Sequence, residues 1–244
     1  MKQGSFTILE NTPLTRDMHR MKLAGDTSAV TRPGTFVNIR LDGFFLRRPL
    51  SVFDCTDGEL TVLYKTVGRG TFAMAEMQPG ERLDLLTGLG NGYDPARAGV
   101  HPLLIGGGAG VPPLYWLARM LRAEGRQVSA ILGFRSVEEI YAEDEFASLG
   151  VRVLVTTEDG SAGIPGYVTA AIPRDGEYSH VYACGPGGML RAVYDATRTD
   201  GQFSFEERMG CGFGACMGCS CRTKYGSKRI CRDGPVLRKE EIVW

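Results

Sequence analysis

The sequence predicts a protein in three parts: a small antiparallel β-barrel, an α/β domain built on a parallel sheet, and a short cysteine-rich C-terminal domain. Residues 1–97 alternate short β-rich runs with turn residues, and residues 98–201 alternate apolar strands with helices. Residues 202–244 hold four closely spaced cysteines and a fifth. With 244 residues, of which 43% are hydrophobic, the chain can form two cores of ordinary size and a small appendage.

The barrel is predicted from six short runs rich in β-branched, aromatic and leucine residues. Turn-forming residues separate these runs, which is typical of antiparallel strands. The runs are residues 6–9, 18–23, 35–41, 50–53, 60–67 and 82–86.

The middle part shows the strand-helix rhythm of a parallel sheet with crossover helices. Its predicted strands are residues 103–105, 128–132, 151–156 and 181–183. Its predicted helices are residues 112–124, ended by Gly125, residues 138–148 and residues 187–198. Sheets of this type bind nucleotides at the carboxyl ends of their strands.

The C-terminal part carries the most specific motif. Cys211, Cys216 and Cys219, followed at a distance by Cys231, reproduce the plant-type ligand spacing of a 2Fe-2S cluster. Glycines at 212, 214 and 218 remove Cβ atoms where the loop must fold tightly around the sulfides. The spacing therefore predicts one-electron chemistry.

Two other uses of these cysteines stay open. A structural zinc site more often has two CxxC pairs separated by a longer spacer. A disulfide framework is typical of small secreted domains, whereas this chain begins with no recognisable signal sequence. Cys221 lies two residues after Cys219 and is a competing ligand candidate, which we interpret as a spare thiol.

A candidate flavin site lies in the barrel. Arg47 and Arg48 precede Pro49, Leu50 and Ser51, and a guanidinium can bind a pyrophosphate through two hydrogen bonds. The alternative is a solvated arginine pair beside an edge strand. The later candidates supply an aromatic ring, a cation and a hydroxyl next to glycine; they are Leu63, Tyr64, Lys65, Gly70 and Thr71.

Two glycine-rich turns mark the candidate nucleotide site. The run from Gly106 to Pro113, which includes Gly108 and Gly110, follows an apolar strand and opens a helix, where backbone N–H groups can meet a pyrophosphate. It reads G-x-G-x-x-P, so the acidic residue of a Rossmann motif is not expected. Cys184 and Gly185 end the last strand, and Cys184 either contacts a nicotinamide or is a core thiol.

Charge and hydropathy exclude two classes of partner. The formal net charge is zero and the longest uncharged stretch is interrupted by glycines and prolines, so we expect neither nucleic acid nor a membrane as partner and a cytoplasmic location. Between residues 208 and 239 there are eight Lys and Arg but one acid, a local charge of +7. The three histidines lie far apart without a nucleophile motif, and we expect no catalytic side chain.

With these motifs in place, the chain resembles the ferredoxin reductase superfamily. Within it the sequence is most similar to the electron-transfer subunits of NAD-linked (type 1B) dihydroorotate dehydrogenase. The similarity covers nearly the whole chain and is most specific from Arg208 to Cys219 and from Lys228 to Pro235, with a further match from Thr157 to Ser161. Gly210 and Cys221 depart from the family pattern, and neither replaces a ligand.

The resemblance implies an electron-transfer function in pyrimidine (UMP) biosynthesis. Electrons would pass from a separate FMN-containing catalytic subunit through the 2Fe-2S cluster and FAD to NAD, in a heterotetramer of two catalytic and two electron-transfer subunits. The implied FAD contacts are Arg48, Pro49, Leu50, Ser51, Leu63, Tyr64, Lys65, Gly70 and Thr71, and the implied cluster ligands are Cys211, Cys216, Cys219 and Cys231.

Three rival functions stay open on the sequence. One is a similar FAD and 2Fe-2S reductase subunit of a hydrogenase, sulfide reductase or transhydrogenase. Another is a non-enzymatic redox-sensing or zinc-binding module. The third, an oxygenase reductase with a fused ferredoxin, fits poorly because 43 residues are few for an independent domain. NAD is preferred to NADP on the resemblance alone, since Arg135 and Ser136 follow the second strand without an acidic residue.

Overall fold

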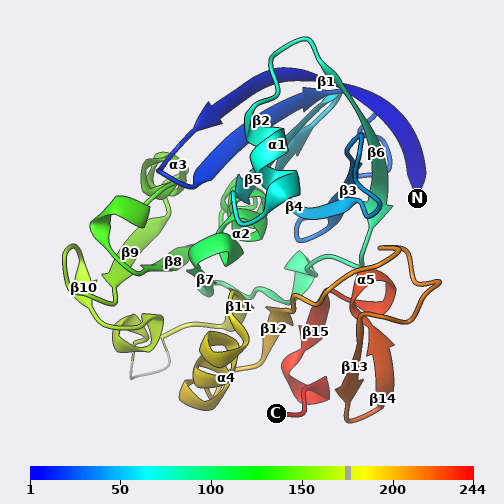
Figure 1. Ribbon diagram of the computed structural model, residues 1–244. Helices are drawn as coiled ribbons and strands as arrows, with labels where there is room; N and C mark the ends of the chain where they lie inside the picture. The colour runs from blue at the N-terminus through cyan, green and yellow to red at the C-terminus, as the bar shows by residue number, and fades with distance from the viewer. Residues whose placement is uncertain (174–176) are drawn as a thin grey trace.

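The computed structural model describes residues 1–173 and 177–244. A closed β-barrel, a seven-stranded sheet and a two-stranded hairpin make up the architecture, and the barrel and the sheet form separate layers (Figure 1). The predicted fold class is confirmed in both of its larger parts. The predicted domain boundaries at residues 97/98 and 201/202 stay predictions.

The barrel closes in the strand order β1-β2-β5-β4-β3-β6, with antiparallel neighbours throughout. All six predicted strands are present, and several are longer than predicted. They are β1 (Lys2–Pro13), β2 (Met18–Ala24), β3 (Phe36–Arg40), β4 (Arg48–Thr56), β5 (Glu59–Lys65) and β6 (Arg82–Leu89). One short helix, α1 (Arg69–Ala75), lies between β5 and β6.

Strands β3 and β4 present one shared face to the outside of the barrel. Val37 and Ile39 belong to the barrel's inner core, so the alternating Phe36 and Asn38 lie on the outer side. Phe36 is opposite Ser51 and Asn38 is opposite Pro49 in the antiparallel register, and opposite residues share a face. Pro49 and Ser51 of the candidate flavin motif therefore look outward beside Asn38.

The sheet has the order β10-β9-β8-β7-β11-β12-β15, and all of its pairs are parallel except β12 with β15. Alternate strand residues face opposite ways: Leu104 and Leu132 pack in one core and Ile105 and Ile131 in another. The strands are β7 (Pro102–Gly107), β8 (Ser129–Phe134), β9 (Arg152–Thr157), β10 (Ile164–Pro165), β11 (His180–Cys184), β12 (Gly201–Ser204) and β15 (Val236–Arg238).

Helices cover both faces of this sheet. Leu114 and Phe146, from α2 (Pro112–Ala123) and α3 (Glu143–Ser148), pack on the face that also meets Phe53 and Leu63 of the barrel. Leu190 and Val193 of α4 (Gly187–Ala196) pack on the other face. The two longer helices agree with the predicted ranges to within two residues.

One predicted helix is wrong in its first half. A single 3-10 turn, η3 (Val137–Glu139), replaces the start of the helix predicted over residues 138–148, and α3 begins only at Glu143. Extended backbone at Ile140 ends the 3-10 turn, and Ala142, just before α3, adopts a left-handed conformation with φ of 61°. Tyr141 is held by its hydroxyl, which donates to the Gly108 carbonyl at 2.7 Å, so tertiary contacts override the local helical pattern here.

The C-terminal residues contribute two strands to the sheet and form a separate segment between those strands. β12 pairs with β11, and the chain then forms a loop, the hairpin of β13 (Ser220–Thr223) and β14 (Gly226–Arg229), and α5 (Ile230–Asp233) before β15 returns to the sheet. Figure 1 shows this segment, in orange and red, beside β3 and β6 of the barrel. The remaining short 3-10 turns are η1 (Pro95–Arg97), η2 (Gly108–Gly110), η4 (Val168–Ala171) and η5 (Lys239–Glu241).

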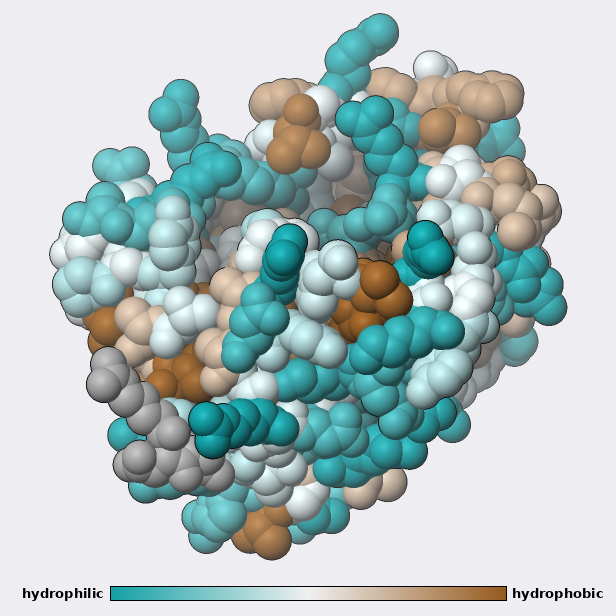
Figure 2. Space-filling view, turned by 90° about the horizontal axis from the view of Figure 1, so that it is seen from below, coloured by the Kyte–Doolittle hydropathy of each residue, from teal (hydrophilic) through white to brown (hydrophobic). Residues whose placement is uncertain are grey.

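The described surface is mixed in polarity. Viewed from below Figure 1, polar side chains surround several small and separate apolar patches (Figure 2). Within the described ranges, every helix is too short or too polar to cross a membrane.

Candidate cofactor site

The four predicted ligand cysteines lie in two pairs. In the outer pair, the backbone N–H groups of Ala215 and Cys216 donate to Cys211 Sγ at 3.2 and 3.4 Å. In the inner pair, the Cys231 N–H donates to Cys219 Sγ at 3.4 Å. Cys219 and Cys231 are buried, at 2% and 1% exposure, whereas Cys216 is exposed.

This arrangement is compatible with the ligand set of a 2Fe-2S cluster. A 2Fe-2S cluster takes four cysteine thiolates and two irons, so two pairs are sufficient. Backbone N–H groups donate hydrogen bonds to the sulfur atoms of Cys211 and Cys219. The thiolate sulfurs of iron-sulfur clusters accept hydrogen bonds of this kind.

The two pairs differ in their electrostatics. Burial raises the pKa of Cys211, but hydrogen bonds from backbone N–H groups of Cys216 and Phe213 outweigh it and lower the pKa to about 6. Burial, followed by the neighbouring Cys219 thiol, raises the pKa of Cys231 to about 12. The outer thiol therefore ionises readily and the inner one only with a positive partner such as iron.

Cys221 lies on the first hairpin strand, opposite Lys228. It is half-buried and packs against the core that contains Cys219 and Cys231. Burial raises the pKa of the Cys221 thiol. Its exclusion from the ligand set stays a prediction.

Two asparagines from the barrel side hold the C-terminal part of the chain, Asn38 at the first cysteine and Asn91 at β15, and the sequence analysis singles out neither. Asn38 Nδ2 donates to the Cys211 carbonyl at 3.2 Å. Asn91 Nδ2 donates to the Val236 carbonyl at 2.7 Å, and Asn91 Oδ1 accepts the Val236 N–H at 3.0 Å. These bonds join residues far apart in sequence, so no local pattern signals them.

The two arginines before the flavin motif have different roles. Arg47 Nη1 pairs with Asp84 Oδ1 at 2.6 Å and donates to two barrel carbonyls, so Arg47 is a structural residue. Within the described chain Arg48 has no carboxylate partner; it lies over the Phe44 ring, 4.6 Å from its centre. The Arg48 guanidinium lies close to Gly70, where a Cβ atom would be 2.2 Å from Arg48 Nε. Arg48 is thus the arginine left available to an anion.

The Leu63–Lys65 segment has fewer side chains free to contact a flavin than its sequence predicts. Tyr64 lies inside the barrel at 2% exposure, where its hydroxyl donates to Asn11 Oδ1 at 2.8 Å and burial raises its pKa to about 12. Lys65 pairs with Asp17 at 2.9 Å. Thr71 Oγ1 accepts the Val67 N–H at 2.9 Å. The ring and the cation are already occupied, which leaves the backbone of this segment for a ligand.

The two glycine-rich turns pack directly on each other at the carboxyl edge of the sheet. A Cβ atom on Gly110 would lie 2.3 Å from the Cys184 carbonyl oxygen, and one on Gly185 would lie 3.3 Å from the Gly107 nitrogen. Gly108 has a positive φ of 49° and is partly exposed. Because Pro112 and Pro113 open α2, its first turn has fewer N–H groups for a phosphate than the motif alone suggests.

Cys184 is fully buried, and burial raises the pKa of its thiol, so the thiol stays protonated near neutral pH. The charge of Glu206, just after β12, raises the pKa of the Cys184 thiol further. The sequence does not single out Glu206, because the next residue is also a glutamate.

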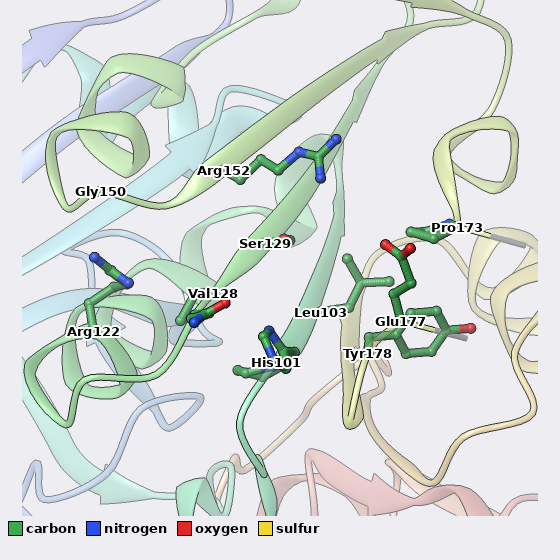
Figure 3. A pocket seen from close by; sticks show the side chains of 12 residues that line it. His101, Leu103, Arg122, Val128, Ser129, Gly150, Arg152, Pro173, Glu177 and Tyr178 are labelled. Carbon is green, nitrogen blue, oxygen red and sulfur yellow. The ribbon is translucent and has the colours of Figure 1, made fainter. Parts of the chain in front are cut away.

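A pocket of about 550 Å³ lies elsewhere, at the amino ends of the parallel strands, and no predicted cofactor residue lines it (Figure 3). Figure 3 shows the Arg122 and Arg152 guanidinium groups standing apart rather than facing one point. Arg122 also donates to the carbonyls of Leu149 and Arg126, at 3.1 and 2.7 Å. Ligands of such sheets bind at the opposite, carboxyl edge.

Comparison with known families identifies two segments. Residues 206–243 match the model described as iron-sulfur cluster binding domain of dihydroorotate dehydrogenase B. Residues 104–195 match the oxidoreductase NAD-binding domain.

Curated relatives match over the full length. The dihydroorotate dehydrogenase B (NAD(+)) electron transfer subunit of Shouchella clausii is 40% identical over 99% of this chain and 98% of its own length. The protein of the same name from Fusobacterium nucleatum is 40% identical over 99% of both chains.

Solved structures agree in fold. A chain from the structure of an NADH-dependent reduced ferredoxin-NADP oxidoreductase, described in work on flavin-based electron bifurcation, is 30% identical with a TM-score of 0.87, covering 98% of this chain and 90% of that one. A ferredoxin NADP+ reductase from Neisseria gonorrhoeae, with bound FAD and NADP, has a TM-score of 0.70 at 18% identity over 80% of this chain and 90% of its own, which shows the fold alone.

Proposed function

Because this chain belongs to the family of dihydroorotate dehydrogenase B (NAD(+)) electron transfer subunits, we propose that it carries electrons from a catalytic subunit to NAD+. The catalytic subunit oxidises dihydroorotate with FMN, in the biosynthesis of pyrimidines. This chain supplies the path and the NAD site but no dihydroorotate chemistry. We also propose a cytoplasmic location, since free thiols for a cluster persist in reducing compartments.

The proposed cofactors are a 2Fe-2S cluster and FAD, with NAD as substrate. Cys211, Cys216, Cys219 and Cys231 hold the cluster, and Arg48 binds the FAD pyrophosphate. A flavin exchanges a hydride or two single electrons whereas the cluster carries one electron, so bound FAD supplies the conversion between them. Pro49 and Ser51 offer the outward face of β4 to the flavin, and Gly108, Gly110, Cys184 and Gly185 form the nucleotide site.

One observation carries the proposal: the cysteine segment packs against β3 and β6 of the barrel, and β3 pairs with β4, the strand of the candidate flavin motif. Phe36 and Leu89 of the barrel share one apolar core with Cys219 and Cys231. Asn38, opposite Pro49, also hydrogen-bonds the Cys211 carbonyl. Two electron carriers bound at these places are neighbours, as electron transfer between them requires.

The partner is proposed to dock on the exposed cysteine loop. Phe213 and Met217 on this loop are 43% and 55% exposed. Nearby exposed cations have no ion-pair partner in the described chain, namely Arg208, Arg222, Lys224 and Arg232. This surface suits an acidic partner with an apolar centre. We propose two copies of each subunit in the assembly.

A second candidate is a reductase subunit of another complex, such as a hydrogenase, sulfide reductase or transhydrogenase. The 30% identity to the ferredoxin-NADP oxidoreductase chain favours such a subunit over a redox sensor or a zinc-binding module. Both candidates need the same cofactors, so only the partner separates them.

Reconstitution tests the proposal. The purified chain should contain FAD, iron and acid-labile sulfide and should oxidise NADH with artificial acceptors. Dihydroorotate-dependent reduction of NAD+ should appear only when the FMN-containing catalytic subunit is added. Co-purification with a hydrogenase or sulfide reductase subunit, together with failure of that reconstitution, would support the second candidate instead.

A further inference from the structure

Asn38 stands between the candidate flavin strand and the cysteine loop. It is 1% exposed and lies on the outer face of β3, opposite Pro49 and diagonal to Ser51 of β4. Directly opposite side chains on such a face lie about 5 Å apart, and diagonal ones about 7 Å. The Asn38 side chain is therefore next to the surface on which the flavin motif opens.

On its other side Asn38 contacts the loop at the first cysteine. Its Nδ2 donates to the Cys211 carbonyl at 3.2 Å. Gly212 has a φ of +78°, and a Cβ atom there would lie 2.3 Å from Asn38 Nδ2. Glycine at 212 thus serves two needs, the left-handed backbone and the close approach of the amide.

The second polar atom of this amide is unused. Asn38 Oδ1 is buried and accepts no hydrogen bond from any residue in the described ranges. Most buried side-chain polar atoms in proteins have a partner. An asparagine retained only to support the barrel would satisfy both of its polar atoms, as Asn91 does.

We propose that Asn38 is a positioning residue for electron transfer between the flavin site and the cluster. This rests on the proposed function. The peptide between Cys211 and Gly212 is planar and trans, so its carbonyl and its N–H point in opposite directions. By holding the carbonyl, Asn38 fixes the direction of the Gly212 N–H beside the outer thiol pair. Hydrogen bonds and burial around the sulfurs set the potential of such a cluster.

Asn38 itself gains and loses no electron or proton. A bound 2Fe-2S cluster would carry one electron at a time, the catalytic subunit would reduce it again between two transfers, and bound FAD would collect both electrons for transfer with one proton to NAD+ as a hydride. The role of Asn38 is to keep the loop at one distance and in one orientation relative to the outer face of β4.

The test replaces Asn38 by leucine, which has a similar size and no donor. In Asn38→Leu we expect the cluster to assemble with a shifted midpoint potential and a shifted EPR spectrum. NADH should reduce the flavin at the wild-type rate, whereas reduction of the cluster after mixing should be slower by roughly 10- to 100-fold, the usual cost of losing a supporting residue of a metal site. Wild-type potential, spectrum and rate in this variant would overturn the proposal.

Asn91→Leu is the matched control, because Asn91 also joins the barrel side to the C-terminal segment through backbone hydrogen bonds. It should lower the melting temperature while leaving the cluster potential and the transfer rate as in the wild type. If both variants change the potential and the rate equally, the effect is a general loosening and Asn38 has no special role.

A second variant covers the case in which Asn38→Leu loses its cluster. Asn38→Asp has the same shape, and its carboxylate cannot donate to the Cys211 carbonyl, so the same shifts are expected. Loss of the cluster in both variants would make Asn38 a structural support and refute the proposal. Wild-type protein without iron or flavin would instead refute the proposed function, which keeps the two failures distinct.

Discussion

The cysteine segment and the carboxyl edge of the parallel sheet form binding sites in opposite ways. The cysteine segment, residues 211–231, uses the side chains of four thiols, and backbone N–H groups donate to two of them, Cys211 and Cys219. The sheet edge uses backbone, since Gly110 and Gly185 let two turns touch where any Cβ atom would collide. The cysteine spacing and the glycine-rich turns are both visible in the sequence, whereas the close packing of the two turns is visible only in the fold.

The largest expected effect comes from a substitution in the cysteine site. Cys231→Ser removes a proposed ligand that is 1% exposed and belongs to a core shared with the barrel. We expect complete loss of the visible absorption and of the EPR signal of the reduced cluster, because binding of the metal and folding of such a segment are coupled.

Cys221→Ser is the control for that prediction. Its thiol lies on the hairpin strand and is expected to ligate no iron, so both signals should remain. Loss of the cluster in Cys221→Ser with retention in Cys231→Ser would reverse the ligand assignment.

The next prediction tests whether a side chain, Arg48, also determines binding of FAD at the barrel. Arg48→Ala removes the arginine that has no carboxylate partner in the described chain, and a charged hydrogen bond contributes about 1.5–3 kcal/mol. The dissociation constant for FAD should therefore rise roughly 10- to 100-fold, as measured by flavin fluorescence on dilution.

Arg47→Ala should behave differently, because Arg47 already pairs with Asp84 inside the barrel wall. It should reduce the free energy of unfolding and leave FAD affinity close to that of the wild type. A larger loss of FAD from Arg47→Ala than from Arg48→Ala would exchange their roles.

A smaller effect tests the backbone site. Gly110→Ala places a methyl group 2.3 Å from a backbone carbonyl oxygen, so one of the two turns must move. Such overpacking costs about 1–3 kcal/mol of stability, and NADH should bind more weakly. A denaturant titration measures the free energy of unfolding of each variant. Gly188→Ala, in α4, places its Cβ atom where no other atom lies within 4 Å, so it should leave that free energy unchanged or raise it slightly. Equal behaviour of the two variants would contradict the role of close packing.

The sequence predicts the barrel well, since its strands depend on local patterns, whereas the assignment of the four cysteine ligands stays a prediction. Prediction from the sequence fails where distant residues decide. Tyr64 has the right type and place for a flavin contact, yet its ring turns into the barrel because strand residues alternate between faces. Asn38 is a buried polar residue between the apolar Val37 and Ile39, and only the packing of Cys211, 173 residues later, gives it a role.

The smallest expected effect is a loss of stability when the pH is lowered slightly. This loss should begin in the parallel sheet. His180 begins β11, the strand that ends at Cys184, and is 2% exposed with its Nε2 3.2 Å from Gln202 Nε2. Burial lowers the pKa of His180 below its ordinary 6.5. The unfolded chain therefore binds a proton near pH 6.5 and the folded chain only at lower pH.

This difference fixes the sign of the pH dependence. The stabilisation is fully present above about pH 6.5 and is lost as the pH falls from there toward the folded pKa, by at most about 1.4 kcal/mol per pH unit. Urea titrations at several pH values should show this slope in wild-type protein and in His101→Gln, whose histidine is exposed at the same edge of the sheet. His180→Gln should flatten it. Amide exchange should rise first in β11 and not in the hairpin of β13 and β14, because His180 lies at the start of β11; a wild-type slope in His180→Gln would assign the dependence to another group.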